Sequence, residues 1–461
     1  MRESCGIFGV YARGEDVSRL TYFGLYALQH RGQESSGIAT ADGNKIRQHA
    51  SMGLVAQVFT ESILDQLRGH IAIGHNRYST TGSNRTTNTQ PIVVSGSLGE
   101  IALAHNGNII NAEHLRKELE ESGYCFSTST DSEVIAYLII SSPGEDIVEK
   151  IKYTMRKLQG AYSLAIITKD SLIGVRDPLG VRPLCLGSLN GGWILSSESC
   201  ALDHLGASLI REIEPGNIVV VDDTGINSFI AEGLEKKALC VFEYIYFARP
   251  DSLISGRRLY PARKAMGEEL AIQHPIDADL VIGVPDSATA AGIGYSRASG
   301  IFFSEGLLKN RYVGRTFIEP EQRMRDIGVK FKFNPVPEEI CDKRLVVVDD
   351  SIVRGTTTPQ VINLLRKVGA KEIHLRICAP PIRYPCFFGV DMATRGELIA
   401  AQKTIPEIAQ AIGADSLGYL SIEGLIKAVG LPREDLCLAC FTGEYPVPVQ
   451  LEMDKLALET P

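Results

Sequence analysis

Short apolar runs separated by polar turns dominate the first half of the chain, a pattern that predicts β-strands. The clearest runs lie at 71–74, 101–104, 163–167 and 193–196. Stretches with helical periodicity interrupt them at 111–121, 132–141 and 145–158. Asn111 and Asp131 stand where helix N-caps are expected, and clusters of Gly and Asn mark the turns. Residues 5–231 are therefore predicted to form an α+β domain with much antiparallel sheet.

From about residue 255 the pattern changes to units of strand, loop and helix. The runs at 280–284, 344–348 and 374–378 are short and largely apolar, as in parallel strands that are buried on both faces. Residues 400–431 are predicted to be helical, and a loop-rich tail with two cysteines follows. We expect a linker at 232–254, an α/β domain at 255–400 and a C-terminal segment at 401–461.

The bulk properties limit the class of protein. A chain of 461 residues is expected to hold two or three domains. It has no apolar run of about 18 residues, and Arg2 and Glu3 stand where a secretory signal would become apolar, so we expect a cytoplasmic protein without membrane contact. A net charge of −8 opposes a general nucleic-acid surface, although local basic pockets for phosphates are compatible with it.

Cys5 opens the motif Cys-Gly-Ile-Phe-Gly, whose apolar residues predict a strand. It can be a buried cysteine at a strand start or a nucleophile. Three clusters in the same half are unusually polar for loops beside apolar strands: Leu-Gln-His-Arg-Gly-Gln-Glu at 28–34, His-Asn-Arg-Tyr-Ser at 75–79 and His-Asn-Gly-Asn at 105–108. Their presence favours the nucleophile.

In this order the four motifs resemble the glutaminase domain of N-terminal-nucleophile amidotransferases, which is an αββα sandwich. In that family the residues before the cysteine are removed, so the resemblance implies that residues 1–4 are a propeptide and that the unprocessed chain is a zymogen. The chemistry explains the removal. An α-amine titrates near pH 7.7–8.0 in model compounds, so a freed Cys5 carries its own proton acceptor beside the thiol.

The resemblance also implies roles for the polar clusters. Asn106 and Gly107 correspond to the oxyanion hole, which needs donors aimed at developing negative charge. Arg77 suits the α-carboxylate of glutamine as a bidentate donor, Asp131 suits its α-amino group, and Arg31 is expected to flank the same site. The ordinary alternatives are that Asn-Gly is a turn and that Asp131 is only an N-cap.

The run at 345–358 combines an apolar strand with a loop of small and polar residues. Two carboxylates end the strand, and the loop carries Ser351, Arg354, Gly355, Thr356, Thr357 and Thr358 before a helix begins near Pro359. Ligands of open α/β sheets bind at this edge, where backbone N–H groups and a helix N-terminus favour phosphate. Asp349 and Asp350 suit ribose hydroxyls or magnesium; their alternative role is to cap the helix. No Gly-Lys-Ser/Thr is present, which excludes a Walker A loop.

This run resembles the phosphoribosyl pyrophosphate (PRPP) signature of type I phosphoribosyltransferases. By the same resemblance, residues 284–289 form the pyrophosphate loop with Asp286 and Ser287, and Ser287, Asp349 and Asp350 bind Mg²⁺. A basic stretch at 309–316 is interpreted as a loop that closes over PRPP, or alternatively as a solvated linker. Its basic residues are Lys309, Arg311 and Arg315, followed further on by Arg323, Arg325 and Lys330.

Cys437 and Cys440 form a Cys-x-x-Cys pair, which alone is ambiguous between zinc, redox chemistry and chance. No adjacent βαβ start supports a thioredoxin-type motif. Cys240 and Cys386 lie in aromatic surroundings near predicted domain junctions. The remaining cysteines lack partners at ligand spacing and are interpreted as packing residues: Cys125, Cys185, Cys200, Cys341 and Cys378.

Taken over its whole length, the chain resembles the amidophosphoribosyltransferase family, and its cysteines resemble those of the iron–sulfur subgroup. That implies a [4Fe–4S] cluster on Cys240, Cys386, Cys437 and Cys440 as a structural staple, with a zinc site as the alternative. It also implies that glutamine, PRPP and water give 5-phosphoribosylamine, glutamate and pyrophosphate, the first step of de novo purine synthesis. Mg²⁺, feedback inhibition by purine nucleotides and a homotetramer are expected with it.

Two other functions are weighed against this one. A different amidotransferase with the same glutaminase, such as a glucosamine-phosphate synthase, is opposed by the run at 345–358. A nucleotide sensor without enzymatic activity is opposed by Cys5, Arg77 and Asn106, because a sensor has no need of a glutaminase.

Overall fold

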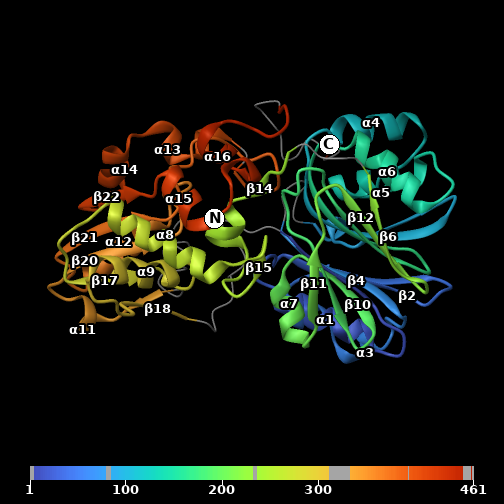
Figure 1. Ribbon diagram of the computed structural model, residues 1–461, viewed down its shortest axis with the longest axis horizontal. Helices are drawn as coiled ribbons and strands as arrows, with labels where there is room; N and C mark the ends of the chain where they lie inside the picture. The colour runs from blue at the N-terminus through green and yellow to red at the C-terminus, as the bar shows by residue number, and fades with distance from the viewer. Residues whose placement is uncertain are drawn as a thin grey trace.

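The computed structural model describes residues 5–78, 85–231, 236–310, 333–392, 394–449 and 458. It has two halves that lie side by side, one built on two antiparallel sheets and the other on a parallel sheet (Figure 1). None of the described helices is long and apolar enough to cross a membrane.

Two antiparallel sheets form the centre of the first half. The larger sheet has the order β11 (Ser208–Glu212), β9 (Cys185–Leu189), β10 (Gly192–Ser196), β1 (Gly6–Tyr11), β4 (Ile71–Arg77), β2 (Ser35–Ala41), β3 (Ile46–Met52). The second has the order β13 (Gly225–Ile230), β12 (Asn217–Asp222), β8 (Leu172–Arg176), β7 (Gly160–Ile167), β6 (Gly99–Ile109), β5 (Ile92–Gly96). The predicted strands at 71–74, 101–104, 163–167 and 193–196 are confirmed.

Helices cover the outer face of each sheet. The larger sheet packs against α1 (Val17–Ala27), α2 (Val55–Val58), α3 (Glu61–Leu64) and α7 (Ser199–Leu205). The smaller sheet packs against α4 (Ala112–Glu121), α5 (Asp131–Ser141) and α6 (Ile147–Lys157), which confirms the three predicted helices, and a short turn, η1 (Thr86–Asn88), precedes β5.

Between the two sheets, small and branched apolar side chains such as Ile7, Ile73, Ala104 and Ala165 fill a fully buried layer. The half is therefore the expected αββα sandwich.

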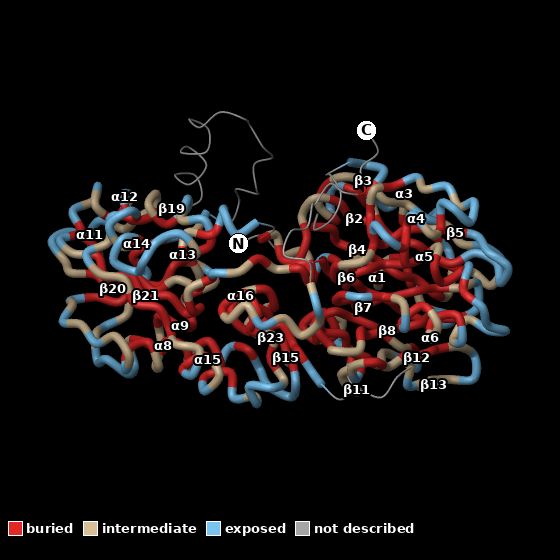
Figure 2. The backbone as a smooth tube through the Cα atoms, turned by 90° about the horizontal axis from the view of Figure 1, so that it is seen from above, coloured by how far each residue is buried: buried red, intermediate tan, exposed pale blue. Residues whose placement is uncertain are grey.

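The second half is a parallel sheet between two layers of helices (Figure 2). Its order is β17 (Leu280–Gly283), β20 (Arg344–Asp349), β21 (Glu372–Ile377), β22 (Ser416–Tyr419). One face carries α8 (Leu259–Gln273), α9 (Thr289–Ser299) and α15 (Ile422–Val429). The other carries α12 (Thr358–Lys367), α14 (Ile405–Ile412), and the short elements α11 (Pro337–Ile340), α13 (Ile399–Gln402), η3 (Arg395–Glu397), β18 (Leu307–Lys309) and β19 (Phe333–Pro335).

The prediction for 400–431 was incomplete, because β22 lies between the two helices of that segment. β22 is only four residues long and gains its structure from β21, with His374 beside Ser416 and Ile377 beside Tyr419. A run this short carries too little periodicity to be distinguished from a helical turn.

The segment predicted as a linker is part of the core. β14 (Leu239–Cys240) pairs in parallel with β23 (Leu436–Cys437) of the tail, and a helical turn at Glu243–Phe247 follows. The neighbouring short elements are β15 (Leu253–Ile254), β16 (Arg257–Arg258), η4 (Arg433–Asp435) and α16 (Ala439–Thr442). Further along the tail, Leu458 packs in the core of the first half, where Arg116 donates a hydrogen bond to its carbonyl at 3.3 Å.

Glycine lets α8 and α9 cross at very close range. A Cβ on Gly267 would lie 1.8 Å from the carbonyl oxygen of Ala291, and one on Gly294 would lie 1.9 Å from that of Lys264. Real Cβ atoms do not approach this closely, so each glycine is required by the crossing. The contact fixes α9, whose first turn at Thr289 continues directly from the loop at 284–288.

We expect Gly267→Ala to lower the stability of the protein by about 1–3 kcal/mol, because the methyl group forces the two helices apart. Urea unfolding followed by circular dichroism should show a lower midpoint. Gly396→Ala is the matched control, since nothing lies within 4 Å of its added Cβ, and its effect should stay within about 0.5 kcal/mol. Equal midpoints for the two variants would contradict the crossing.

Candidate active sites

The pairing of β1 with β4 places Cys5 beside the loop that follows β4. Gly6 is in register with Asn76, so Cys5 faces the Arg77–Tyr78 backbone. The Cys5 thiol donates to the carbonyl oxygen of Tyr78 at 3.3 Å and its sulfur accepts from the amide of Tyr78, also at 3.3 Å. The backbone carbonyl and amide of Tyr78, directly after β4, thus hold the sulfur in place.

Burial controls the protonation of this thiol. It raises the pKa of Cys5 to about 11, although the hydrogen bond with Tyr78 and the charge of Arg77 act in the opposite direction. A thiol with that pKa is protonated at neutral pH, and the thiolate is the nucleophilic form. Cys5 therefore needs a base beside it to react.

A cavity opens beside Cys5 and collects residues from β4, β6 and the start of α5. Its lining comprises Cys5, Arg77, Tyr78, Gln90, His105, Gly107, Thr130, Asp131 and Ser132. Four residues predicted from sequence thus meet at one cavity: Cys5, Arg77, Gly107 and Asp131. Asn106 is buried directly before Gly107 on β6.

Asp131 is the first residue of α5, and the N-cap of that helix is Thr130, so capping is not the role of Asp131. Its Oδ2 accepts the amide of Ile109 at 3.0 Å. Burial would raise the pKa of Asp131, but nearby His105 and the backbone amides outweigh it and hold that pKa below its usual range. Asp131 is consequently a buried carboxylate that faces the cavity.

Gly107 cannot be replaced by a larger residue. Its φ is +154°, and a Cβ there would lie 1.9 Å from the carbonyl oxygen of Ala161 on the neighbouring strand β7. β6 pairs with β7 so that Gly107 lies opposite Tyr162. This backbone position is thus fixed by the sheet, as a preorganised donor requires.

Sequence reasoning missed several residues around the cavity. Gln90 donates to the hydroxyl of Ser132 at 2.9 Å and accepts the amide of His105 at 2.9 Å. His105 Nδ1 lies 3.1 Å from the same hydroxyl and 3.7 Å from Asp131 Oδ1. Tyr78 and His105 stand inside motifs that the sequence had singled out and Ser132 follows Asp131 directly, whereas nothing local distinguishes Gln90.

The structure places Arg31 beside Cys5. Its guanidinium does not line the cavity, because two buried carboxylates hold it on the other side of Cys5. It donates to Glu198 at 2.6 Å and to Glu243 at 2.8 Å, and its Nε donates to the carbonyl oxygen of Cys5 at 3.0 Å. Arg31 contacts the backbone of Cys5 and is not among the residues that line the cavity.

In the second half, the two predicted phosphate loops meet at one edge of the sheet. β17 and β20 are adjacent and parallel, with Gly283 in register with Val348. The loop at 284–288 and the loop at 349–357 therefore leave the same edge, and α9 and α12 follow them. Carboxyl ends of parallel strands are where open α/β sheets bind ligands.

The paired carboxylates begin the second of these loops. Asp349 Oδ1 accepts the amide of Asp350 at 2.9 Å, and the hydroxyl of Ser351 donates to Asp350 Oδ1 at 2.5 Å. Arg354, Thr356 and Thr357 are exposed to solvent. The loop thus offers fixed carboxylates at its base and accessible donors at its rim.

Two residues that were predicted to bind PRPP, Lys309 and Asp286, form an ion pair with each other. Lys309 donates to Asp286 at 2.7 Å, and Arg354 pairs with Glu397, also at 2.7 Å. Such exposed ion pairs contribute little and exchange readily. Arg311, Arg323, Arg325 and Lys330 lie outside the described residues.

Four cysteines from distant segments converge between the halves. Cys240 is in register with Cys437, and the carbonyl of Cys440 accepts the amides of Arg383 and Tyr384, next to Cys386. Burial raises the pKa of Cys240 to about 11 and that of Cys440 well above its usual value, and the neighbouring thiols of the set add to both shifts. These thiols are close enough to influence one another.

In the described part of the chain, no three or more His, Cys, Asp or Glu side chains are arranged so that they could hold a metal ion. Of the other cysteines, Cys185, Cys200 and Cys378 are buried as predicted. Cys125 and Cys341 are exposed, so their interpretation as packing residues was wrong. Lack of a partner at ligand spacing says nothing about burial.

Comparisons with known proteins decide the family. A family model described as a glutamine amidotransferase domain matches residues 75–204. An amidophosphoribosyltransferase from Synechococcus elongatus is 50% identical over 466 residues, covering 99% of this chain and 94% of the relative. Another from Methanocaldococcus jannaschii is 51% identical, covering 97% and 98%. The chain belongs to the amidophosphoribosyltransferase family.

Solved structures of the family share its fold. A glutamine PRPP amidotransferase from Bacillus subtilis, complexed with ADP and GMP, has a TM-score of 0.92 at 44% identity and covers 99% of this chain and 100% of its own. A structure described as the allosteric regulatory enzyme of purine biosynthesis has a TM-score of 0.92 at 45% identity, covering 98% of both chains. These likenesses confirm the predicted fold, a glutaminase sandwich followed by an α/β domain.

In protein that retains residues 1–4, alkylation of Cys5 by iodoacetamide should have its pH midpoint near 11, because only the thiolate reacts and burial raises the pKa of Cys5 to about 11. Mass spectrometry of the Cys5 peptide across a pH series gives this midpoint independently of the absolute rate, which burial also lowers. Exposed Cys125 serves as the internal reference for reagent activity. A midpoint close to that of a free cysteine would refute the expected effect of burial.

Proposed function

We propose that this chain converts PRPP, glutamine and water to 5-phosphoribosylamine, glutamate and pyrophosphate, the first committed step of de novo purine synthesis. The observation that carries the proposal is that one chain holds both a cavity beside the buried Cys5 thiol and a loop with paired carboxylates at the edge of a parallel sheet. A relative from the family is 50% identical to it over 99% of this chain. Neither a sensor nor an unrelated amidotransferase needs both sites.

In the first half, the thiol of Cys5 would add to the amide carbon of glutamine while the α-amine of a processed Cys5 accepts the thiol proton. Asn106 and Gly107 would stabilise the oxyanion, and the returned proton would leave with ammonia, giving a γ-glutamyl thioester that water then hydrolyses to glutamate. Arg77 and Asp131 suit the α-carboxylate and α-ammonium groups of the substrate. The high thiol pKa supports the need for this base.

In the second half, ammonia would attack C1 of PRPP and pyrophosphate would leave. Asp349 and Asp350 are suited to the ribose hydroxyls and, with Ser287, to Mg²⁺, which would stabilise the charge on pyrophosphate. The loop donors Ser351, Arg354, Gly355 and Thr356 to Thr358 would hold the 5′-phosphate. Ammonia must reach this site without protonation, because ammonium is not a nucleophile, so we expect it to travel inside the protein.

We further propose a [4Fe–4S] cluster on Cys240, Cys386, Cys437 and Cys440. Cys240 and Cys440 are buried in one apolar core, and partly buried Cys386 and Cys437 pack against it. The amide of Phe388 donates to the sulfur of Cys386 at 3.4 Å, a contact that suits a cluster ligand. A zinc ion holds sulfurs at about 2.3 Å, which draws them around one point. A tetrahedral zinc site on the same four thiolates is the alternative.

Regulation and assembly follow the family in this proposal. The Bacillus subtilis enzyme was solved with ADP and GMP, and we infer that purine nucleotides also bind and inhibit this chain. A homotetramer remains a prediction from the resemblance. Ten unpaired thiols suit a reducing compartment such as the cytoplasm.

Cys5→Ser and Asp349→Asn should separate the two half-reactions. Cys5→Ser is expected to lose glutamine-dependent release of pyrophosphate by at least about 100-fold, because the nucleophile is gone. It should keep synthesis from added ammonia, since the second site is untouched. Asp349→Asn should lose both reactions. Glutamate and pyrophosphate are measured with PRPP and Mg²⁺ present.

Protein whose mass begins at Cys5 is the reference for both variants. If this processed wild-type protein releases neither glutamate nor pyrophosphate, the proposed function is wrong. If protein that retains residues 1–4 is fully active, the α-amine is not the base. A Cys5→Ser variant that still uses glutamine would exclude Cys5 as the nucleophile.

Anaerobically purified protein should contain about four iron and four sulfide per chain with a broad visible absorption, as a [4Fe–4S] cluster requires. Cys437→Ser should lose most of the iron. Cys125→Ser is the matched control, because Cys125 is exposed outside the set, and its iron content should not change. Colourless protein that carries one zinc per chain would refute the cluster.

A further inference from the structure

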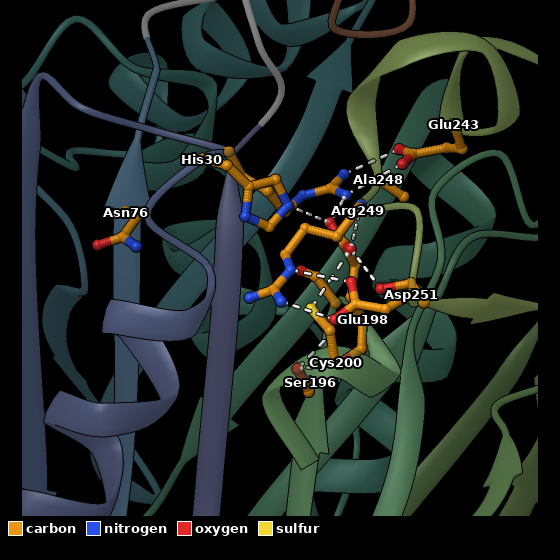
Figure 3. A network of polar contacts seen from close by, with 12 residues as sticks. His30, Asn76, Ser196, Glu198, Cys200, Glu243, Ala248, Arg249 and Asp251 are labelled. Carbon is orange, nitrogen blue, oxygen red and sulfur yellow. Dashed lines mark hydrogen bonds and ion pairs between the residues drawn. The ribbon is translucent and has the colours of Figure 1, made fainter. Parts of the chain in front are cut away.

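A network of buried charges joins the two halves beside Cys5 (Figure 3). Arg31 lies between Glu198 of the first half and Glu243 of the segment that leads into the second half, and all three side chains are fully buried. Burial would raise the pKa of Glu198, but His30 and Arg31 outweigh it and hold that pKa well below its usual range. The network is therefore ionic, and each charge depends on its partners.

This network holds the nucleophile from its backbone side. Arg31 Nε donates to the carbonyl oxygen of Cys5 at 3.0 Å, while the backbone of Tyr78 holds the sulfur. Because β1 begins directly after Cys5, a shift of the guanidinium would move the residue that carries the thiol.

Glu243 binds a second guanidinium. Its Oε1 accepts from Arg182 at 3.2 Å as well as from Arg31 at 2.8 Å. Arg182 in turn donates to the carbonyl oxygen of Phe388 at 2.7 Å. One carboxylate thus links the arginine that holds Cys5 to the arginine that holds the segment at 387–389.

The segment at 387–389 packs against the strand that supplies the oxyanion donors. Asn108 donates to the carbonyl oxygen of Phe387 at 3.0 Å. Gly389 has a φ of +92°, and a Cβ there would lie 3.0 Å from the carbonyl group of Gly107 and 3.2 Å from Arg182 Nη2. The backbone of Gly107 is therefore braced by a segment of the second half.

We propose that Glu243 is a positioning residue for glutamine hydrolysis, although it does not line the glutamine cavity. Through Arg31 it fixes Cys5, and through Arg182 and the 387–389 segment it braces Gly107, so it sets the distance between nucleophile and oxyanion donor. The inference rests on the proposed roles of Cys5 and Gly107. An amide in place of this carboxylate leaves two buried guanidiniums poorly paired, and they must separate.

The test is Glu243→Gln in the full-length processed enzyme. The kcat for glutamine hydrolysis should fall about 10- to 100-fold, because small misplacements of reacting groups have effects of that size. The KM for glutamine should change less than about 3-fold, because Arg77 and Asp131 line the cavity and Glu243 does not. Synthesis of 5-phosphoribosylamine from added ammonia should stay within about 2-fold, since it bypasses Cys5.

Arg182→Lys is the second variant, because a lysine keeps the charge but cannot bridge Glu243 and Phe388 with a planar fork. This variant should also lower the kcat for glutamine hydrolysis. Asp251→Asn is the matched control: Asp251 pairs with Arg249 at the half-exposed end of the network and contacts neither Cys5 nor the 387–389 segment. Its kcat should equal that of the wild type.

The outcomes separate the possibilities. If the wild type is active and the kcat for glutamine hydrolysis is unchanged in Glu243→Gln and Arg182→Lys, the inference is overturned but the proposed function stands. If both variants lose the glutamine-dependent and the ammonia-dependent reaction to the same extent, Glu243 has a purely structural role, and this result also overturns the inference. If Glu243→Gln does not fold, Arg182→Lys decides between these results. An inactive wild type would instead refute the proposed function.

Discussion

The pairing of fully buried charges at the junction of the two halves is the constraint on which the rest of this structure depends. Arg31, Arg182, Glu198 and Glu243 have no exposed side-chain surface, and an isolated buried ion costs several kcal/mol. The hydrogen bonds that pair these charges require β1, the turn at Glu243–Phe247 and the 387–389 segment to stand in one arrangement. The network therefore selects the geometry in which the halves meet more than it adds stability.

Local patterns account for the parts of the fold that sequence predicted. Apolar strands such as β4, β7 and β20 are long enough to show their periodicity, and a chemical group predicted at a strand end, such as Cys5 or Asp349, is brought to that end by the strand itself. Parallel neighbours share an edge, so the meeting of residues 284–288 and 349–357 also follows from the strands.

Contacts between distant segments account for what sequence did not predict. Arg31 lies in a polar motif, yet its partner Glu243 is 212 residues away, and no spacing rule joins the two. β22 exists because β21 is beside it, and Gln90 matters only because it holds Ser132 and His105. The segment expected as a linker is buried because the cysteines of β14 and β23 meet there.

The two sites solve opposite physical problems, and this explains why they lie in different kinds of backbone. The cavity at Cys5 is buried in sheet, where few waters screen the fixed groups and position decides their effect. The rim of the loop at 349–357 is accessible to solvent. There Arg354 pairs with Glu397 and Lys309 with Asp286, and such partly exposed ion pairs exchange readily with another charged partner. Rigidity at the first site and exchange at the second are thus both required of one chain.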